Sequence, residues 1–295
     1  MTTPRRVKPG DPLVIVGALS LVVMAFGVIL WALGPSAGDK YTDFGSSLAV
    51  GASIGLALLG VEHLVTSRIE KSHLRSTEER RFLKSLLAAP DLIGVRLRDR
   101  ALSGLVFADR DLRGADLTRA IFDRSDLRRI NISGATLNGA QLGDANLAHA
   151  DVRDARAAGI TADDAIFDGA NFSNATLVGS TLTRCSMEGT SFYRANLTAG
   201  DLSGSDLRRA TLEECEAPKA SFDNADLRAA SFAGAILTNA SFRSADLRGA
   251  DLSSAVLTGA DLRGADLRDC KTHGTVLTSL RSNDATRWPT SIRPI

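Results

Sequence analysis

The feature that most constrains the fold is a hydrophobic residue at every fifth position from Leu92 to Leu277. Of these 38 central positions, 34 hold Leu, Phe, Ile, Val or Met, and no insertion or deletion interrupts the series. The residue two places earlier is small in nearly every repeat from Ala115 onward. A period of five matches neither the 3.6 residues of a helical turn nor the two of a strand. Because a single unit has too little apolar surface to fold, the pattern predicts a solenoid of stacked repeats.

A second, longer period indicates how the repeats stack. The tripeptide Asp-Leu-Arg recurs at every fourth pentapeptide. A β-branched residue followed by Leu-Thr recurs at the same interval. A coil of four pentapeptides places such residues in columns, so residues 91–280 predict about nine coils and, at roughly 4.8 Å per coil, a rod of about 45 Å. Two columns are candidate interaction surfaces. The charged ladder is Asp206, Arg208, Asp226, Arg228, Asp246, Arg248, Asp266 and Arg268, and the apolar ladder is Ile236, Thr238, Val256, Thr258, Val276 and Thr278.

The repeat residues, as in SADLRGADLSSAVLTGADLRGADLR from Ser244 to Arg268, resemble the pentapeptide repeat family. The resemblance implies a right-handed, four-sided β-helix in which the central residue and the small residue two before it point inward. It also implies a bacterial source. It implies no single function, because members of the family have varied roles.

Charge restricts the possible partners. The chain has 35 basic and 34 acidic residues, and from Asp91 onward it has 25 and 27, a net charge of −2. A basic nucleic-acid binder is therefore excluded, and no nucleic-acid partner is expected. Some soluble members of the family act on topoisomerases as acidic mimics of a DNA duplex. Near-neutral charge disfavours that alternative here.

The first 90 residues predict a membrane anchor. Residues 13–33 form an uncharged apolar run, long enough to span a bilayer at about 20 residues, and residues 46–65 form a second, weaker one. We expect a basic tail over residues 1–11, a hairpin of two transmembrane helices within residues 12–66, and a charged helical linker over residues 67–90. In the second span Ser47, Gly51 and Gly55 are spaced four apart, a pattern that permits close helix packing.

The orientation of the hairpin follows from the charges that flank it. Arg5, Arg6 and Lys8 precede the first span, the connecting loop has only Lys40, and several Arg and Lys residues follow the second span. The positive-inside rule then places both ends, and therefore the solenoid, in the cytoplasm. The predicted fold is an all-β solenoid preceded by an α-helical transmembrane hairpin, located in the cell membrane as a multi-pass protein.

No catalytic constellation is evident in the sequence. The four histidines are scattered, and no nucleophile, phosphate loop or metal-ligand spacing stands out, so we expect no enzyme, no small-molecule substrate, no cofactor and no metal. Three cysteines occupy the small inward place and are expected to be apolar fillers: Cys185, Cys215 and Cys270. An acidic stretch from Asp151 to Asp168 is expected to be a solvated face rather than a Ca²⁺ site.

Two irregular places give further predictions. Ile160 stands at a small position two residues before Ala162 at a central one, so we expect Ile160 to point inward and fill the space that Ala162 leaves. Residues 281–295 are expected to form a capping tail in which Trp288 covers the last coil.

The function that these features predict is that of a non-enzymatic, membrane-anchored interaction module with an unidentified protein partner. The apolar ladder near the C-terminus makes a homodimer through the last coils one candidate assembly; the alternative is a strip that the closing tail partly covers.

Overall fold

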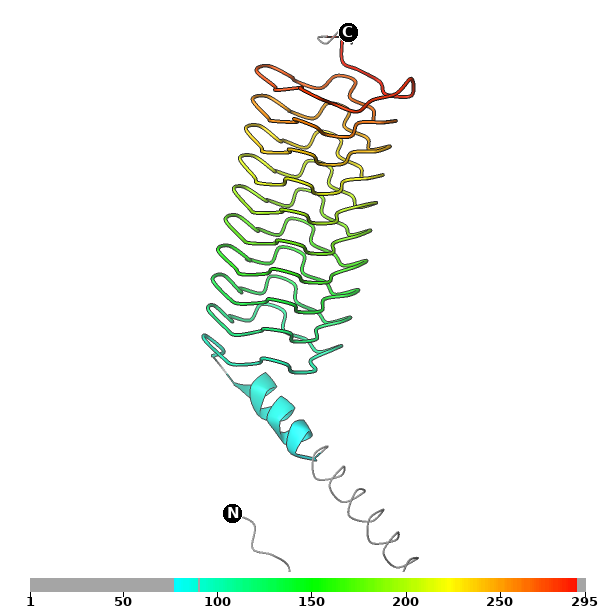
Figure 1. Ribbon diagram of the computed structural model, residues 1–295. Coiled ribbons are helices and arrows are strands. Elements are labelled where there is room, and N and C mark those ends of the chain that lie inside the picture. The colour runs from blue at the N-terminus through cyan, green and yellow to red at the C-terminus, as the bar shows by residue number, and fades with distance from the viewer. Residues whose placement is uncertain (1–76, 90, 291–295) are drawn as a thin grey trace, which may run out of the picture. The chain divides into compact units, whose positions relative to one another are not determined.

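The computed structural model describes residues 77–89 and 91–290, within two units that comprise Met1–Leu86 and Leu87–Ile295 (Figure 1). A helix covers residues 77–88 and lies within the predicted linker. No helix of the described residues is long and apolar enough to cross a membrane. The two predicted spans, including Ser47, Gly51 and Gly55, lie outside the described residues.

The second unit is a solenoid whose coils are held together by isolated parallel bridges rather than by long strands (Figure 1). Each bridge joins a residue to the one 20 places later, from Arg96↔Asp116 to Asp261↔Arg281. The predicted coil of four pentapeptides is therefore confirmed. Pairing continues past residue 280, the end of the repeat predicted from the sequence, because Arg281 and Arg287 both form bridges. The last bridge, Asp266↔Arg287, joins positions one place further apart than the others, which marks an extra residue in the closing coil.

Corners are formed by a turn in every pentapeptide. The backbone N–H three residues after the central residue donates to the carbonyl of the central residue, as from Ala115 to Leu112 at 3.1 Å. The residue two places after the central one has a positive φ in every repeat from Gly94 to Ser279. A positive φ at this place of a turn favours Gly and Asn. Arg119 and Ala199, with φ of 54° and 55°, show that the stack also imposes this conformation on residues that disfavour it.

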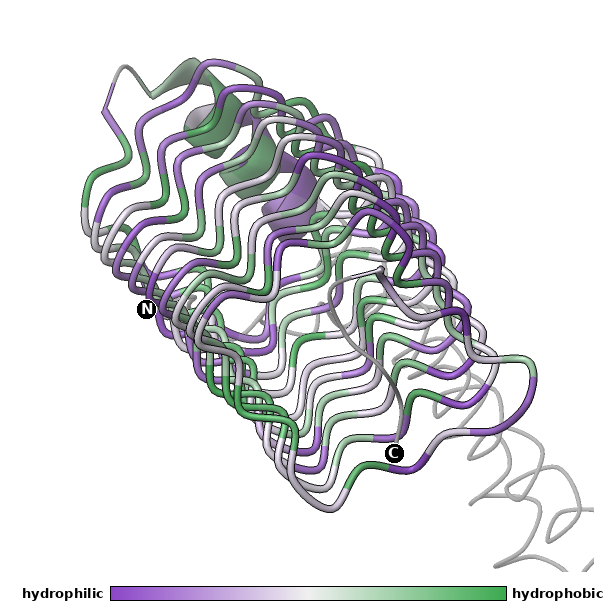
Figure 2. Cartoon of the chain, turned by 90° about the horizontal axis from the view of Figure 1, so that it is seen from above, coloured by the Kyte–Doolittle hydropathy of each residue, from purple (hydrophilic) through white to green (hydrophobic). Residues whose placement is uncertain are grey.

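The core is a column of side chains inside the coils, as the sequence predicts. Central residues and those two before them are buried throughout the regular coils, whereas the other three positions of each repeat are mostly exposed or half-buried. Figure 2 shows how hydrophobic and hydrophilic residues alternate along the coils. Phe222 and Phe242 stack one coil apart, with ring centroids at 5.0 Å and an interplanar angle of 9°. Ile160 and Ala162 are both buried, at 1% and 0% exposure, which confirms that Ile160 points inward.

Polar residues at the small inward position are satisfied by the backbone of the preceding coil. Ser125 Oγ donates to the carbonyl of Leu102 at 2.9 Å, and Thr190 Oγ1 donates to that of Phe167 at 2.7 Å. Since the same carbonyls also accept the turn hydrogen bond, the hydroxyl uses their second lone pair. Ser and Thr are therefore tolerated inside the solenoid because the buried hydroxyl meets an acceptor.

Both ends of the stack depart from the regular coil. In the first coil, Arg100 occupies a small inward position but is exposed, and Arg110 donates from a guanidinium nitrogen to the carbonyl of Leu87 at 2.7 Å. In the last coil, Leu277 is half-buried rather than buried, and so is Trp288. The prediction that Trp288 covers the end of the core remains a prediction.

Candidate interaction surfaces

The charged ladder consists of ion pairs that close within each pentapeptide. Arg208, Arg228, Arg248 and Arg268 each place a terminal guanidinium nitrogen 2.6 Å from the carboxylate two residues earlier. The backbone N–H of each arginine also donates to the same carboxylate. The hydrogen bonds from arginine hold the pKa of Asp206, Asp246 and Asp266 below the ordinary value. The ladder is neutral at each step, so it offers no field of a single sign.

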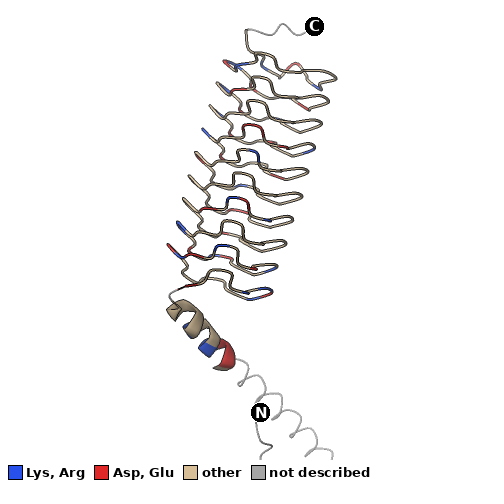
Figure 3. Cartoon of the chain, turned by 90° about the vertical axis from the view of Figure 1, so that its left-hand side faces the viewer, with Lys and Arg blue, Asp and Glu red and all other residues tan. Residues whose placement is uncertain are grey.

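Pairing between the coils of the charged ladder is weaker. Arg208 Nε lies 3.9 Å from Asp226, and Arg228 Nε lies 3.7 Å from Asp246. Glu188, one coil before Arg208, accepts from it at 3.0 Å and from Arg209 at 3.0 Å. Pairs this exposed contribute little stability. Acidic and basic residues are interspersed along the described solenoid (Figure 3).

A second set of ion pairs links corners of successive coils, and the sequence analysis did not foresee it. Arg119 pairs with Asp99 and Arg129 with Asp109, at 2.6 and 2.5 Å. Arg184 pairs with Asp164 in the same way, at 2.7 Å. Each pair joins equivalent positions of positive φ in neighbouring coils. Comparison of the corner columns at the four-pentapeptide period would have revealed these pairs.

The most enclosed carboxylate of these networks is Asp261, whose side chain is 9% exposed. It accepts from Arg263 at 2.6 Å and from Arg243 of the preceding coil at 2.7 Å. The hydrogen bond from Arg263, followed by that from Arg243, outweighs burial and depresses the pKa of Asp261 strongly. Arg243 lies 18 residues before Asp261, slightly less than one full coil. A comparison of residues stacked directly on one another therefore does not reveal this pair.

The apolar ladder is present as an outward column near the C-terminal end of the solenoid. Ile236 and Val276 are exposed, at 43% and 40%, and Val256 between them is half-buried. Bridges Ile236↔Val256 and Val256↔Val276 stack the three residues directly. Thr258 and Thr278 share a hydrogen bond between their hydroxyl groups at 2.9 Å, and Thr238 is half-buried. The ladder therefore has the predicted geometry, while its role as an interface stays a prediction.

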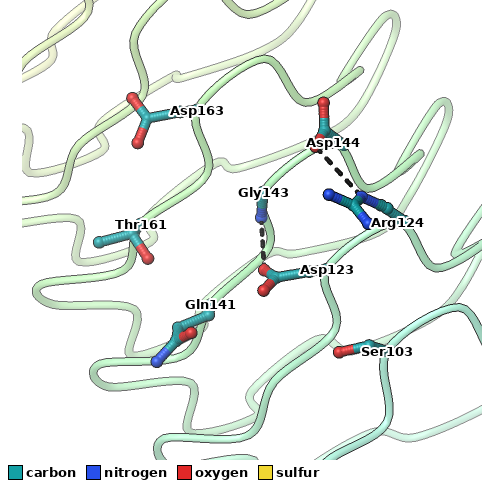
Figure 4. Close-up of a pocket in the computed structure, with 8 residues that line it drawn as sticks. All are labelled: Ser103, Asp123, Arg124, Gln141, Gly143, Asp144, Thr161 and Asp163. Carbon is teal, nitrogen blue, oxygen red and sulfur yellow. Dashed lines mark hydrogen bonds and ion pairs between the residues drawn. The ribbon is translucent and has the colours of Figure 1, made fainter.

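A pocket of about 370 Å³ lies where Gly143 interrupts a column of outward side chains (Figure 4). Asp123 and Asp163 flank the gap one coil to either side, and Asp123 accepts from the backbone N–H of Gly143 at 2.9 Å. Asp163 accepts from the hydroxyl of Thr183. The carboxylates are thus held by the solenoid's own groups, and no cluster that could hold a metal occurs among residues 77–89 and 91–290.

The three cysteines are buried and unpaired by disulfides. Cys185 Sγ donates to the carbonyl of Ala162 at 2.8 Å and Cys270 Sγ to that of Leu247 at 3.0 Å, in the manner of the buried Ser and Thr hydroxyls. Burial raises the pKa of Cys185, Cys215 and Cys270 to about 12. They are therefore thiols at neutral pH and poor nucleophiles.

Two models of pentapeptide repeats match the chain. One, Pentapeptide repeats, matches residues 91–129, 125–161 and 235–271, and the other, Pentapeptide repeat region, matches residues 179–252. Together they cover more than half of the chain. The chain belongs to the pentapeptide repeat family.

Solved structures of this family are similar to the chain. HetL of Nostoc sp. strain PCC 7120, a pentapeptide repeat protein involved in heterocyst differentiation regulation, is 28% identical; the match covers 68% of this chain and 92% of HetL, with a TM-score of 0.31. QnrB1, a plasmid-mediated fluoroquinolone resistance protein, is 19% identical over 62% of this chain and 94% of its own, with a TM-score of 0.37. The Nostoc protein alr5209 is 31% identical over 32% of this chain and 77% of its own, with a TM-score of 0.31. Such low TM-scores add nothing to the fold assignment, which rests on the family models and the coil register. No curated protein matches the chain.

Proposed function

We propose that this protein is a non-enzymatic, membrane-anchored scaffold whose pentapeptide solenoid presents fixed columns of side chains to a protein partner in the cytoplasm. The observation that carries the proposal is the unbroken register of parallel bridges from Arg96 to Arg281. A solenoid in which each coil contacts only its neighbours gives an extended surface without a catalytic cleft. The apolar runs at residues 13–33 and 46–65 supply the anchor.

The alternative, a topoisomerase-directed mimic of a DNA duplex, has less support. A duplex mimic needs a dense acidic surface, whereas ion pairs neutralise many carboxylates of the solenoid, as at Asp206 and Asp261. A membrane anchor would also keep such a mimic away from most of the chromosome.

Proximity labelling with a ligase fused to the C-terminus of the full chain tests the scaffold function. The expected result is a small set of proteins labelled by the intact chain and lost when the charged ladder or the apolar ladder is altered. A matched control is a chain altered at Arg153 and Asp151, an equivalent pair on another side of the solenoid. If labelled proteins are the same for all variants and for an unrelated membrane-anchored ligase, the scaffold proposal is contradicted.

A second copy of the chain is one partner that the apolar ladder suits. Ile236 and Val276 expose β-branched apolar surface that a two-fold pairing would cover. Three coils give a strip well below the roughly 800 Å² per partner of a stable interface, so we expect a weak dimer that co-anchoring in the membrane strengthens. Replacing Ile236 and Val256 by Asp should leave a folded monomer in sedimentation analysis at concentrations where the unchanged chain dimerises. A chain that is monomeric before the change contradicts this assembly.

A further inference from the structure

One side of the solenoid carries almost no charge over the six coils that include Thr136 and Thr238. The outward residues just before and just after the central residues form two columns on this side, and the apolar ladder, which begins at Ile236, continues the same columns. Over the six coils these residues are Thr136, Asn138, Arg156, Ala158, Thr176, Val178, Asn196, Thr198, Glu216, Pro218, Ile236 and Thr238. Arg156 and Glu216 are the only charged residues among the twelve.

Neither Arg156 nor Glu216 has an ion-pair partner among the described residues, and both are exposed. Glu216 accepts one hydrogen bond, from the side-chain amide of Asn196 at 3.3 Å. They lie in the same column but three coils apart. At roughly 4.8 Å per coil this separation is about 14 Å, which is too far for the two side chains to pair with each other. An ion pair for either residue therefore requires another molecule.

The positions of these two residues suit a second copy of the chain. The point midway between Thr176 and Asn196 is equally far from Arg156 and from Glu216. A two-fold axis through that point, lying in the plane of this side and across the rod, sets two copies antiparallel and places each column against itself in reverse order. Arg156 then faces Glu216 of the partner subunit, and symmetry repeats the pair. An axis along the rod instead places Arg156 opposite Ala158 of the partner subunit, which leaves both charges without a pair.

The same antiparallel register brings uncharged side chains together on either side of the two ion pairs. Thr136 faces Ile236 of the partner subunit, and Ala158 faces Pro218 of the partner subunit. Six coils at roughly 4.8 Å each give a contact about 29 Å long, twice the length of the three-coil apolar ladder. The apolar ladder therefore lies against the early coils of the partner subunit rather than against its own copy.

We infer that this side of the solenoid forms an antiparallel, two-fold homodimer in which two ion pairs between Arg156 and Glu216 set the register. Opposite charges placed symmetrically about the axis favour this register, because a shift by one coil leaves all four charges unpaired. The inference rests on the self-association proposed for the apolar ladder and does not depend on the membrane anchor.

Cross-linking between introduced cysteines tests the register. Two full chains with different tags, one carrying Thr136→Cys and the other Ile236→Cys, are co-expressed and oxidised. The native cysteines are buried, and their pKa of about 12 keeps them unreactive at neutral pH. We expect a disulfide between the two tagged chains and none when either variant is expressed alone, since like positions are then five coils, about 24 Å, apart. A disulfide between two Ile236→Cys chains, or none in the mixture, would overturn the inference.

Charge reversal tests the two ion pairs. Arg156→Glu or Glu216→Arg alone replaces two attractive contacts by two repulsive ones. At about fivefold per exposed contact, which corresponds to about 1 kcal/mol, each single variant should weaken the dimer by about 25-fold in sedimentation equilibrium. The double variant should recover the affinity of the unchanged chain. Arg153→Glu, in the same coil as Arg156 but on another side, is the matched control and should leave the affinity unchanged.

Failure of the register and failure of self-association are distinguishable. A full chain that is monomeric at every concentration overturns both the homodimer proposed for the apolar ladder and this inference. A chain that dimerises equally well after either single reversal, or a double variant as weak as the single variants, overturns only the antiparallel register.

Discussion

The first coil and the coil of residues 151–170 have the same length and backbone register but differ in what they bury. The interior coil encloses Ile160 and Phe167, at 1% and 0% exposure, between coils on both sides. The first coil carries Arg100 and Arg110 at the equivalent small positions and leaves Val106 61% exposed. Central residues are nevertheless buried in both coils, since Leu97 and Phe107 of the first coil are 0% exposed. The difference teaches that the register suffices to bury the central positions, whereas only the interior coils bury every small inward position as well.

The largest expected effect is a cavity in the interior coil. Ile160→Ala should lower the free energy of unfolding by about 2–5 kcal/mol, because Ile160 compensates for Ala162 and the gap would have no other side chain to fill it. Val106→Ala in the first coil should change it by less than about 0.5 kcal/mol. Urea unfolding of the full chain measures both. Adding Ala162→Leu to Ile160→Ala should recover part of the loss, and equal values for the two single variants would contradict the comparison.

Replacing the enclosed carboxylate should have the next largest effect. Asp261→Asn should cost about 1–3 kcal/mol, since it weakens charged hydrogen bonds to Arg243 and Arg263. The corresponding change in the first coil, Asp109→Asn, affects a fully exposed pair and should have little effect. Urea unfolding of the two variants side by side measures the difference, and equal losses would contradict it.

The stabilising effect of the Asp261 ion pairs should also depend on pH. The pKa of Asp261 is depressed in the folded chain, so its stabilising contribution is complete above the unfolded pKa of about 3.9 and is lost as pH falls below that value toward the folded pKa. The free energy of unfolding, measured from neutral pH into acid, should therefore fall less steeply below the unfolded pKa in Asp261→Asn than in the unchanged chain. An identical slope would show that the Asp261 pairs do not contribute in solution.

The smallest expected difference in the free energy of unfolding is between substitutions at two corner glycines. Gly104 of the first coil and Gly259 of a late coil have φ of 69° and 72°, so an alanine at either place is strained by about 1–2 kcal/mol. A Cβ at Gly104 meets nothing within 4 Å, whereas one at Gly259 would lie 2.3 Å from Asn239 Oδ1. Gly259→Ala should therefore cost more than Gly104→Ala in the same unfolding experiment. Equal costs would mean that Asn239 moves aside freely, and the reverse order would contradict the comparison.

Much of the fold could be predicted from the sequence because its two periods, one pentapeptide and four pentapeptides, specify both the inward positions and the stacking. The inward orientation of Ile160 could be predicted from side-chain volume, because Ala162 at the central position leaves space for it, and both residues are buried. The surface was harder to predict. Arg243 pairs with Asp261 although the two residues are not separated by a whole coil. The pocket at Gly143 arises because glycine has no side chain to fill that position of the column. The role of the two ladders depends on an unknown partner, which no periodicity within the chain identifies.

The central proposal, that two membrane spans hold the solenoid in the cytoplasm, is tested most directly by thiol labelling of intact cells. A cysteine introduced at Asp39, in the predicted external loop, should react with a membrane-impermeant reagent, whereas one at Glu79 should react only after the cells are opened. The native cysteines give little background, because they are buried and burial raises their pKa to about 12. Labelling at Glu79 in intact cells, or none at Asp39, would contradict the account.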